Sequence, residues 1–289
     1  MTILDEIKES FREGSVLTRL IYVNLGVFLT FRILNVFFFL SNTPFPFMDW
    51  LALPSDFSML ASRPWTLLTY MFLHFDFLHI LFNLLWLFWM GQIFLSYFDQ
   101  EKLLILYLLG GIAGGLAYVA GFNSFPVFAG VVEDSRLLGA SASIIAIVTA
   151  LAVYAPNHTL QLMFIGPVKM KYIALVSILM YVIGISSSNA GGNLAHLGGA
   201  LGGLLYVLQI RRRGISTKSS GAFFSGIKSR FASKPKVKVS YRKPANDIDY
   251  NRQKNQDQKH MNEILEKISK SGYDSLTREE KEFLFKMGN

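Results

Sequence analysis

Six long apolar segments dominate this sequence. Most of them approach the roughly 20 residues that a helix needs to cross the hydrocarbon core of a bilayer. Because lipid cannot hydrogen-bond to the backbone, such segments fold as helices that satisfy their own N–H and C=O groups. The sequence therefore predicts an all-α polytopic membrane protein, a bundle of six transmembrane helices. The predicted spans are 16–40, 66–96, 102–121, 139–155, 170–187 and 193–210.

The composition supports a membrane protein and excludes thiol chemistry. Of the 289 residues, 52% are hydrophobic and only 17% are charged, against roughly 25% charged in a soluble domain. The chain has no cysteine. A disulfide framework, a thiolate nucleophile and a cysteine metal site are therefore all excluded.

The positive charge lies in the C-terminal tail. From residue 211 onward there are 19 Lys and Arg against 9 Asp and Glu, so the tail carries the basic excess of a chain whose net charge is +8. Residues 211–243 hold eleven basic residues and no acidic one. We expect this stretch to be disordered and to contact anionic lipid, at about 1 kcal/mol per basic residue near the surface. Because the stretch directly follows a predicted membrane helix, contact with lipid explains its basic charge without a nucleic-acid partner.

Patterning divides the chain into four parts. The first has apolar residues at helical spacing, which predicts either an amphipathic helix on the cytoplasmic membrane surface or a solvated lead-in segment. The last reads as a short helical hairpin, with Gly272 as a helix C-cap and Thr277 and Glu280 as a capping box. The expected parts are a surface segment 1–15, a six-helix membrane domain 16–210, a basic linker 211–258 and the hairpin 259–289.

Two further expectations concern the membrane. The apolar loop 41–63 between the first two spans contains three prolines and is expected to lie in the membrane interface. Most basic residues of the short loops fall on the side that carries both termini, so the positive-inside rule makes the termini cytoplasmic. Four acidic residues among the first 15 argue against a cleavable signal peptide.

Three of the five histidines, His74, His79 and His196, lie inside predicted spans. A polar ring in hydrocarbon is costly, so each needs a partner or a function. His79 and Asn83 are four residues apart, share one helix face and could both donate hydrogen bonds to a developing oxyanion. On a straight helix His74 would lie about 140° from His79, which makes the two poor joint ligands.

Ser141 is the candidate nucleophile. It lies in Gly139-Ala140-Ser141-Ala142, where small residues allow close approach of another backbone or a substrate carbonyl. Serine needs a base, and His196 lies on a Gly/Ala-rich segment suited to tight packing. The last two spans contain no Asp or Glu. The residues therefore permit a Ser-His dyad rather than a triad.

In this order, these elements resemble the rhomboid family of intramembrane serine proteases. The C-terminal hairpin also resembles an extension seen in some bacterial members. The resemblance covers about residues 16–210. The sequence pieces that carry it are Arg63-Pro64-Trp65, His74 to Asn83, Tyr107 to Gly115, Gly139-Ala140-Ser141 and Ala195 to Gly199.

The resemblance implies a role for each residue. Ser141 would be the nucleophile and His196 the general base, while the Ser141 amide, His79 and Asn83 would form the oxyanion hole. Gly139 would give room at the nucleophile, and His74 would be a supporting residue.

The resemblance also implies the kind of substrate, the need for cofactors and the cellular membrane. The substrates would be membrane proteins with a transmembrane helix, cut through an acyl-enzyme in the lipid bilayer. No cofactor and no metal would be needed. The protein would be a multi-pass protein of the bacterial inner (plasma) membrane.

Two positions depart from the family pattern. Ala142 stands where glycine is usual, and Ile145 stands where an aromatic residue often stacks on the base. These departures leave open a non-catalytic chaperone or scaffold on the same fold. A proton or ion transporter that uses the histidines as a relay is a further alternative. A metalloprotease is disfavoured, because the sequence lacks His-Glu-x-x-His.

Overall fold

A computed structural model describes residues 2–162, 165–213 and 247–287. The chain forms two compact units, which divide between residues 231 and 232. Residues 214–246, which contain most of the basic stretch expected to be disordered, lie outside the described residues. The first unit contains every residue of the predicted site.

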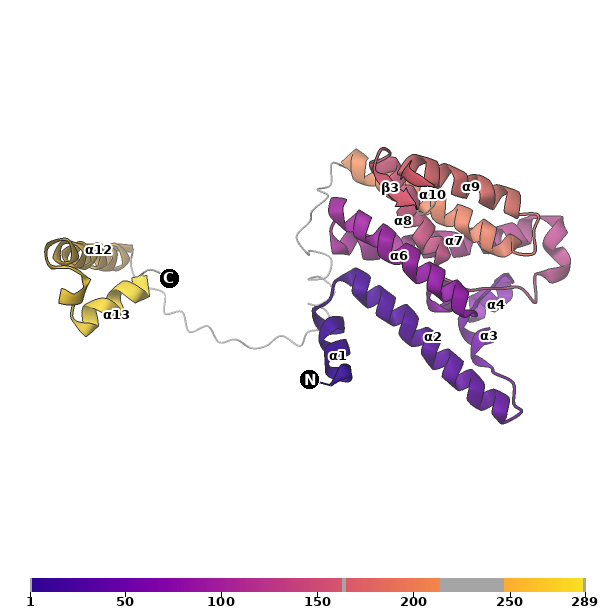
Figure 1. Ribbon diagram of the computed structural model, residues 1–289, viewed down its shortest axis with the longest axis horizontal. Helices are drawn as coiled ribbons and strands as arrows, with labels where there is room; N and C mark the ends of the chain where they lie inside the picture. The colour runs from indigo at the N-terminus through magenta and orange to yellow at the C-terminus, as the bar shows by residue number, and fades with distance from the viewer. Residues whose placement is uncertain (1, 163–164, 214–246, 288–289) are drawn as a thin grey trace. The chain divides into compact units, whose positions relative to one another are not determined.

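The first unit is a bundle of helices (Figure 1). In the described residues, α2, α6, α7 and α10 are long and apolar enough to cross a membrane, while α8 and α9 are shorter apolar helices. An all-α polytopic fold is therefore confirmed, and the count of six spans stays a prediction. The helices are α1 (Ile3–Glu13), α2 (Val16–Leu40), α6 (Phe77–Tyr97), α7 (Gln100–Ser124), α8 (Ser141–Tyr154), α9 (Met170–Gly184) and α10 (Ala190–Arg213).

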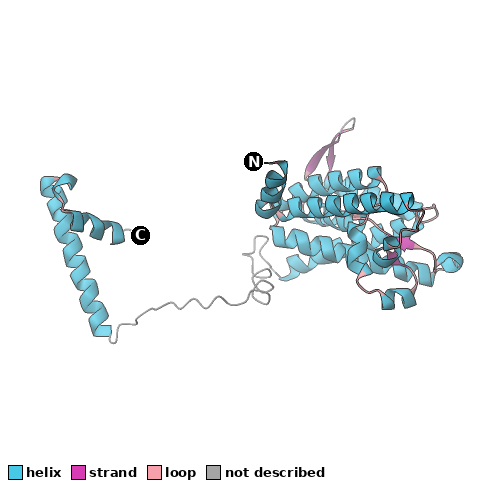
Figure 2. Cartoon of the chain, turned by 90° about the horizontal axis from the view of Figure 1, so that it is seen from below, coloured by secondary structure: helices cyan, strands magenta, loops and turns pink. Residues whose placement is uncertain are grey.

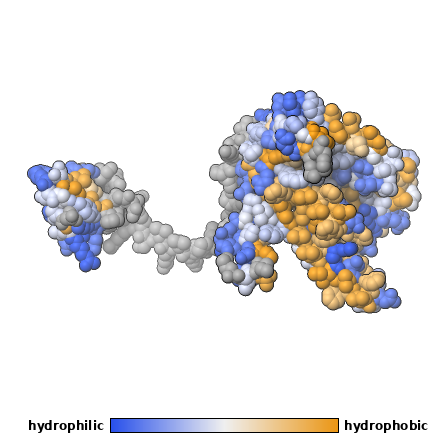
Figure 3. Space-filling view, viewed as in Figure 1, coloured by the Kyte–Doolittle hydropathy of each residue, from blue (hydrophilic) through white to orange (hydrophobic). Residues whose placement is uncertain are grey.

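Apolar side chains lie on the outside of this unit as well as in its core. Figure 3 shows a broad hydrophobic surface over α6 and α2. Phe37 and Phe39 of α2 and Phe82 of α6 are exposed. A surface of this size would be unfavourable in water, so it is the surface that a membrane protein presents to lipid.

The loop between the first two spans folds into short elements. They are α3 (Phe47–Leu51), β1 (Leu53–Pro54), α4 (Phe57–Ser62), α5 (Thr66–Thr69) and the 3-10 helix η1 (Tyr70–Phe72). Trp50 and Trp65 stack with ring centroids 6.3 Å apart, and Arg63 lies over the Trp50 ring. Exposed tryptophans of this kind are enriched at the membrane–water interface.

The predicted helix 66–96 is wrong in one respect. The chain turns through α5 and η1, becomes extended at Leu73 and starts α6 only at Phe77. The hydropathy pattern did not show this break, because the residues before it, Tyr70 to Leu73, are apolar. The available signal was Asp76, which stands at the N-cap of α6. The break places His74 before α6 rather than on it.

The site lies where α7, α8 and α10 pack together. Residues 142–152 of α8 are all buried, and the glycines of α7 and α10 face its backbone and alanines. A Cβ on Gly110 would lie 2.3 Å from the Ala146 Cβ, and one on Gly203 would lie 2.2 Å from the Ala146 carbonyl oxygen. Only glycine allows the helices to approach this closely.

Two short β-ladders complete the first unit. β1 pairs antiparallel with β2 (Arg136–Leu137), with Leu53 opposite Leu137, and so ties the interfacial loop to the chain that leads into α8. β3 (Thr159–Leu162) and β4 (Gly166–Lys169) form a hairpin between α8 and α9 (Figure 2). The sequence reading did not predict either ladder.

The second unit consists of α12 (Asp247–Ser271), the 3-10 helix η3 (Tyr273–Ser275) and α13 (Arg278–Met287). Gly272 follows α12 with φ +78°. The Thr277 amide donates to Glu280 Oε2 (2.7 Å), and the Glu280 amide donates to Thr277 Oγ1 (3.3 Å), which confirms the predicted capping box. α12 begins at Asp247, upstream of the predicted hairpin start at residue 259.

Candidate active site

The backbone before α8 presents Ser141 at the start of its helix. Gly139 has φ +121°, a region that side chains rarely adopt. Its amide donates to the Tyr70 carbonyl oxygen at 2.9 Å. Because Ser141 is the first residue of α8, its backbone N–H has no carbonyl acceptor within the helix.

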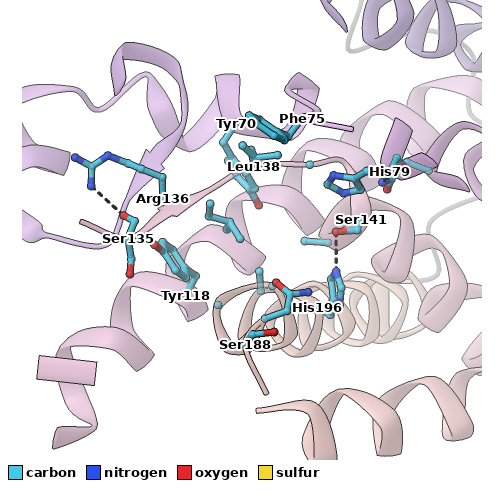
Figure 4. Close-up of a pocket in the computed structure, with 18 of the residues that line it drawn as sticks. Tyr70, Phe75, His79, Tyr118, Ser135, Arg136, Leu138, Ser141, Ser188 and His196 are labelled. Carbon is cyan, nitrogen blue, oxygen red and sulfur yellow. Dashed lines mark hydrogen bonds between the residues drawn. The ribbon is translucent and has the colours of Figure 1, made fainter. Parts of the chain in front are cut away.

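The structure brings the candidate nucleophile and the candidate base together. His196 Nε2 lies 2.6 Å from Ser141 Oγ, although the two residues are 55 positions apart and lie on α10 and α8. Figure 4 shows the Ser141 side chain between the rings of His79 and His196. The distance is that of a hydrogen bond through which a proton can pass from the serine to the histidine.

The His196 ring also has an aromatic neighbour. The ring centroids of His196 and Tyr181 of α9 are 4.4 Å apart and the planes are tilted by 57°. Within the described residues, the buried His196 Nδ1 has no hydrogen-bond partner. The imidazole is therefore oriented by Ser141 and by packing, without a carboxylate.

His79 and Asn83 lie on one face of α6, as their spacing predicts. A Cβ on Gly139 would lie 2.9 Å from His79 Nε2 and 3.8 Å from Ser141 Oγ, so the His79 ring covers Gly139 beside the serine. Asn83 Nδ2 donates to the His79 carbonyl oxygen at 2.8 Å. An amide carries two N–H donors, so this bond leaves the second one for a ligand.

The position of His74 corrects an argument made from the sequence. Because His74 precedes α6, the angle calculated for a straight helix does not apply. Its ring lies against His79 in an edge-to-face arrangement, with centroids 5.1 Å apart. Its Nε2 lies 3.5 Å from the Ala140 amide. His74 thus contacts both the His79 ring and the chain next to Ser141.

The methyl group of Ala142 is accommodated by α7. A Cβ on Gly114 would lie 2.5 Å from the Ala142 Cβ, so the methyl group occupies the space that glycine leaves at residue 114. Ala142 is 1% exposed. The departure from the usual glycine therefore changes the contact between α8 and α7.

Two cavities open on Ser141. The larger has a volume of about 630 Å³ and extends from His79 and His196 to Tyr118 and Arg136 (Figure 4). The smaller, of about 240 Å³, lies between α6, α8 and α9. Ser141 and Asn83 line both. A ligand could therefore reach Ser141 by two routes. One is the larger cavity, which extends to Arg136, and the other is the smaller cavity between α6, α8 and α9.

Sequence reasoning missed Tyr181 and Tyr70. Tyr181 is one of several aromatic residues in an apolar segment, and nothing in its spacing links it to His196. Tyr70 donates through its hydroxyl to the Gly111 carbonyl oxygen (2.6 Å) and holds Gly139 through its backbone. Both roles depend on contacts between elements that are far apart in the chain.

Comparison with known proteins identifies the family. Residues 61–213, more than half of the chain, match the rhomboid domain. This chain belongs to the rhomboid family. Residues 246–286 match a second family, DUF6576, whose function is unknown. The chain is thus a multi-pass membrane protein with a rhomboid domain followed by a separate C-terminal module.

Named relatives agree with this assignment. The chain is 30% identical to RHOMBOID-like protein 12, mitochondrial, of Arabidopsis thaliana over 71% of its own length and 61% of that protein. It is 29% identical to the rhomboid protease GlpG of Yersinia pseudotuberculosis over 55% of its length and 52% of that protein. It therefore spans about half to three fifths of the length of these relatives.

Proposed function

We propose that this rhomboid is an intramembrane serine endopeptidase that cuts membrane proteins in or next to a transmembrane helix. The observation that carries the proposal is the 2.6 Å contact between Ser141 Oγ and His196 Nε2 inside an apolar bundle. A hydroxyl paired with an imidazole in a cavity is the minimal arrangement for acyl transfer by serine.

His196 acts as general base and then as general acid. As Ser141 Oγ attacks a peptide carbonyl carbon, its proton passes to His196 Nε2. The same proton then passes to the leaving amine, the C–N bond breaks and an acyl-enzyme remains. A water molecule, deprotonated by His196, attacks the ester carbon, releases the new carboxyl end and restores the Ser141 hydroxyl.

The oxyanion of each tetrahedral intermediate is stabilised by three donors. They are the Ser141 amide at the start of α8, the His79 ring and the second N–H of the Asn83 amide. Donors of this kind act strongly in a site shielded from bulk water, because solvent does not screen them. Gly139 keeps the space under His79 open, and His74 supports the His79 ring through the contact described above.

The setting of the reaction is also part of the proposal. From the distribution of basic residues we propose that both termini are cytoplasmic and that the protein lies in the bacterial plasma membrane. The basic tail contacts anionic lipid of the same leaflet. The substrates are membrane proteins with a transmembrane helix, which reach Ser141 from the bilayer.

The test uses purified full-length protein in liposomes with a model single-span substrate. We expect wild-type protein to cleave the substrate and to be labelled at Ser141 by a fluorophosphonate, whereas Ser141→Ala and His196→Ala are folded and inactive. Full cleavage by Ser141→Ala would contradict the proposal. A wild-type protein that is folded but neither cleaves nor reacts with the probe would indicate a non-catalytic membrane scaffold.

A further inference from the structure

The orientation of the His196 ring is weakly determined by its own helix. Its neighbours on the same face of α10 include Gly192, Gly199 and Ala200, which are too small to hold an imidazole in place. The larger neighbour, Asn193, bonds through its amide to the Gly184 and Asn189 carbonyl oxygens. The His196 Nδ1 has no hydrogen-bond partner within the described residues. The Ser141 hydroxyl holds only one edge of the ring. Something else must prevent the ring from rotating about its side-chain bonds.

α8, the helix that bears the nucleophile, has no aromatic residue one turn after Ser141 that could restrain the imidazole. Ile145, one turn after Ser141, lines the 240 Å³ cavity together with the serine. Its aliphatic side chain offers no ring to pack against the imidazole. The aromatic contact instead comes from α9, which packs against both α8 and α10.

We propose that Tyr181 is a positioning residue for the catalytic base. This inference rests on the proposed function. The Tyr181 ring lies against the His196 ring, with 4.4 Å between centroids. In this proposal it restricts rotation of the imidazole away from Ser141. Tilted ring pairs at this distance are attractive as well as space-filling. The reaction steps proposed above use no group of α9, so the catalytic effect of Tyr181 is exerted through His196.

The position of Tyr181 also connects the base to the smaller cavity. Tyr181 lines that cavity together with Trp86 of α6 and Ile145 of α8. A group that enters there meets the Tyr181 ring on one side and Ser141 on the other. The contact that orients the base therefore forms part of the wall that a ligand from the bilayer would touch.

The decisive variant is Tyr181→Leu, which removes the ring and keeps an apolar side chain. Displacement of a catalytic group by about 1 Å can cost roughly 100-fold in rate. We expect kcat for a model single-span substrate to fall about 10- to 100-fold, with KM changed less than about threefold. The rate of fluorophosphonate labelling of Ser141 should fall in parallel, because it also depends on His196.

Three further variants separate positioning from general packing. Tyr181→Phe keeps the ring and should restore most of the activity that Tyr181→Leu loses. In the Tyr181→Leu background, Ile145→Phe puts a ring back into the same cavity and should recover part of kcat. Tyr172→Leu makes the same substitution on α9 at a side chain that is 51% exposed, and should leave both cleavage and labelling unchanged.

The results distinguish this inference from the proposed function. Wild-type kcat and labelling in Tyr181→Leu would overturn the role of Tyr181, while the protease assignment would stand. An equal loss in Tyr181→Phe would assign the effect to the hydroxyl and also overturn it. If Tyr181→Leu does not fold, Tyr181→Met replaces it, and wild-type kcat in that variant overturns the proposal. Failure of the wild-type protein itself would reject the protease function.

Discussion

Gly199 of α10 approaches Ala142 of α8 so closely that an added Cβ would lie 2.2 Å from the Ala142 carbonyl oxygen. Gly199 is three residues after His196, and Ala142 directly follows Ser141. The contact therefore lies one turn or less from both members of the dyad. It sets how far apart the helices that bear the base and the nucleophile stand.

Gly199→Ala should consequently impair catalysis by separating the two helices. A carbonyl oxygen cannot move aside as a flexible side chain can, so the backbone must shift. We expect overpacking to cost about 1–3 kcal/mol of stability and kcat to fall about 10- to 100-fold, measured by thermal unfolding and by cleavage. Gly26→Ala on α2, where nothing lies within 4 Å of the added Cβ, is the control and should be active.

Gly139→Ala should be inactive for a different reason. The residue has φ +121°, where an L side chain is strained by about 1–3 kcal/mol, and its Cβ would lie 2.9 Å from the His79 ring. We expect loss of cleavage together with slower fluorophosphonate labelling of Ser141. Gly130→Ala, whose Cβ would meet open space, should behave as wild type. Normal cleavage by Gly139→Ala would show that the His79 position is not needed.

Replacement of either side chain of the proposed oxyanion hole should lower kcat more than it changes KM. Loss of one such donor typically costs about 100- to 1,000-fold in kcat. We predict this range for His79→Ala and for Asn83→Ala, because each removes one donor; the Asn83 amide has its second N–H for the oxyanion beside its bond to the His79 carbonyl oxygen. The double variant should lose less than the product of the two effects. Steady-state kinetics in liposomes measures all three.

The helical hairpin of the second unit should loosen in acid. Hydrogen bonds from the Lys267 ammonium and the Thr277 amide lower the pKa of Glu280 from its usual value of 4.5. A lowered folded-state pKa stabilises the hairpin above about pH 4.5, and this contribution is lost as the pH falls through the lowered value. Hydrogen exchange of the α13 amides in the full chain, corrected for intrinsic rates, should show this loss of protection.

A matched pair of variants tests the assignment to Glu280. Glu280→Gln should reduce protection at neutral pH and remove the acid transition. Glu282→Gln, on the same helix in an exposed pair with Arg278, should keep the transition. An acid transition that persists unchanged in Glu280→Gln would show that another group is responsible.

The sequence was sufficient for features that depend on local pattern. Long apolar runs place most of the helices because backbone hydrogen bonding in lipid leaves few alternatives. The spacing of His79 and Asn83 places them on one face because a helix has a fixed period. The capping box of Thr277 and Glu280 is likewise a local pattern. The break before α6 escaped prediction, because the residues that precede it, Tyr70 to Phe72, and those that follow it, Phe77 and Leu78, are apolar.

Only the tertiary structure decided how the parts of the site meet. Ser141 and His196 are 55 residues apart, and their 2.6 Å contact depends on α8 and α10 packing through glycine. His74 reaches His79 only because the chain turns before α6, and Tyr181 reaches His196 only because α9 packs on α10. The sequence determined which chemical groups are present and, for the site residues other than His74, which helices carry them. Packing between helices distant in the chain decided their distances, because the side-chain pattern of one helix carries no information about how closely another approaches it.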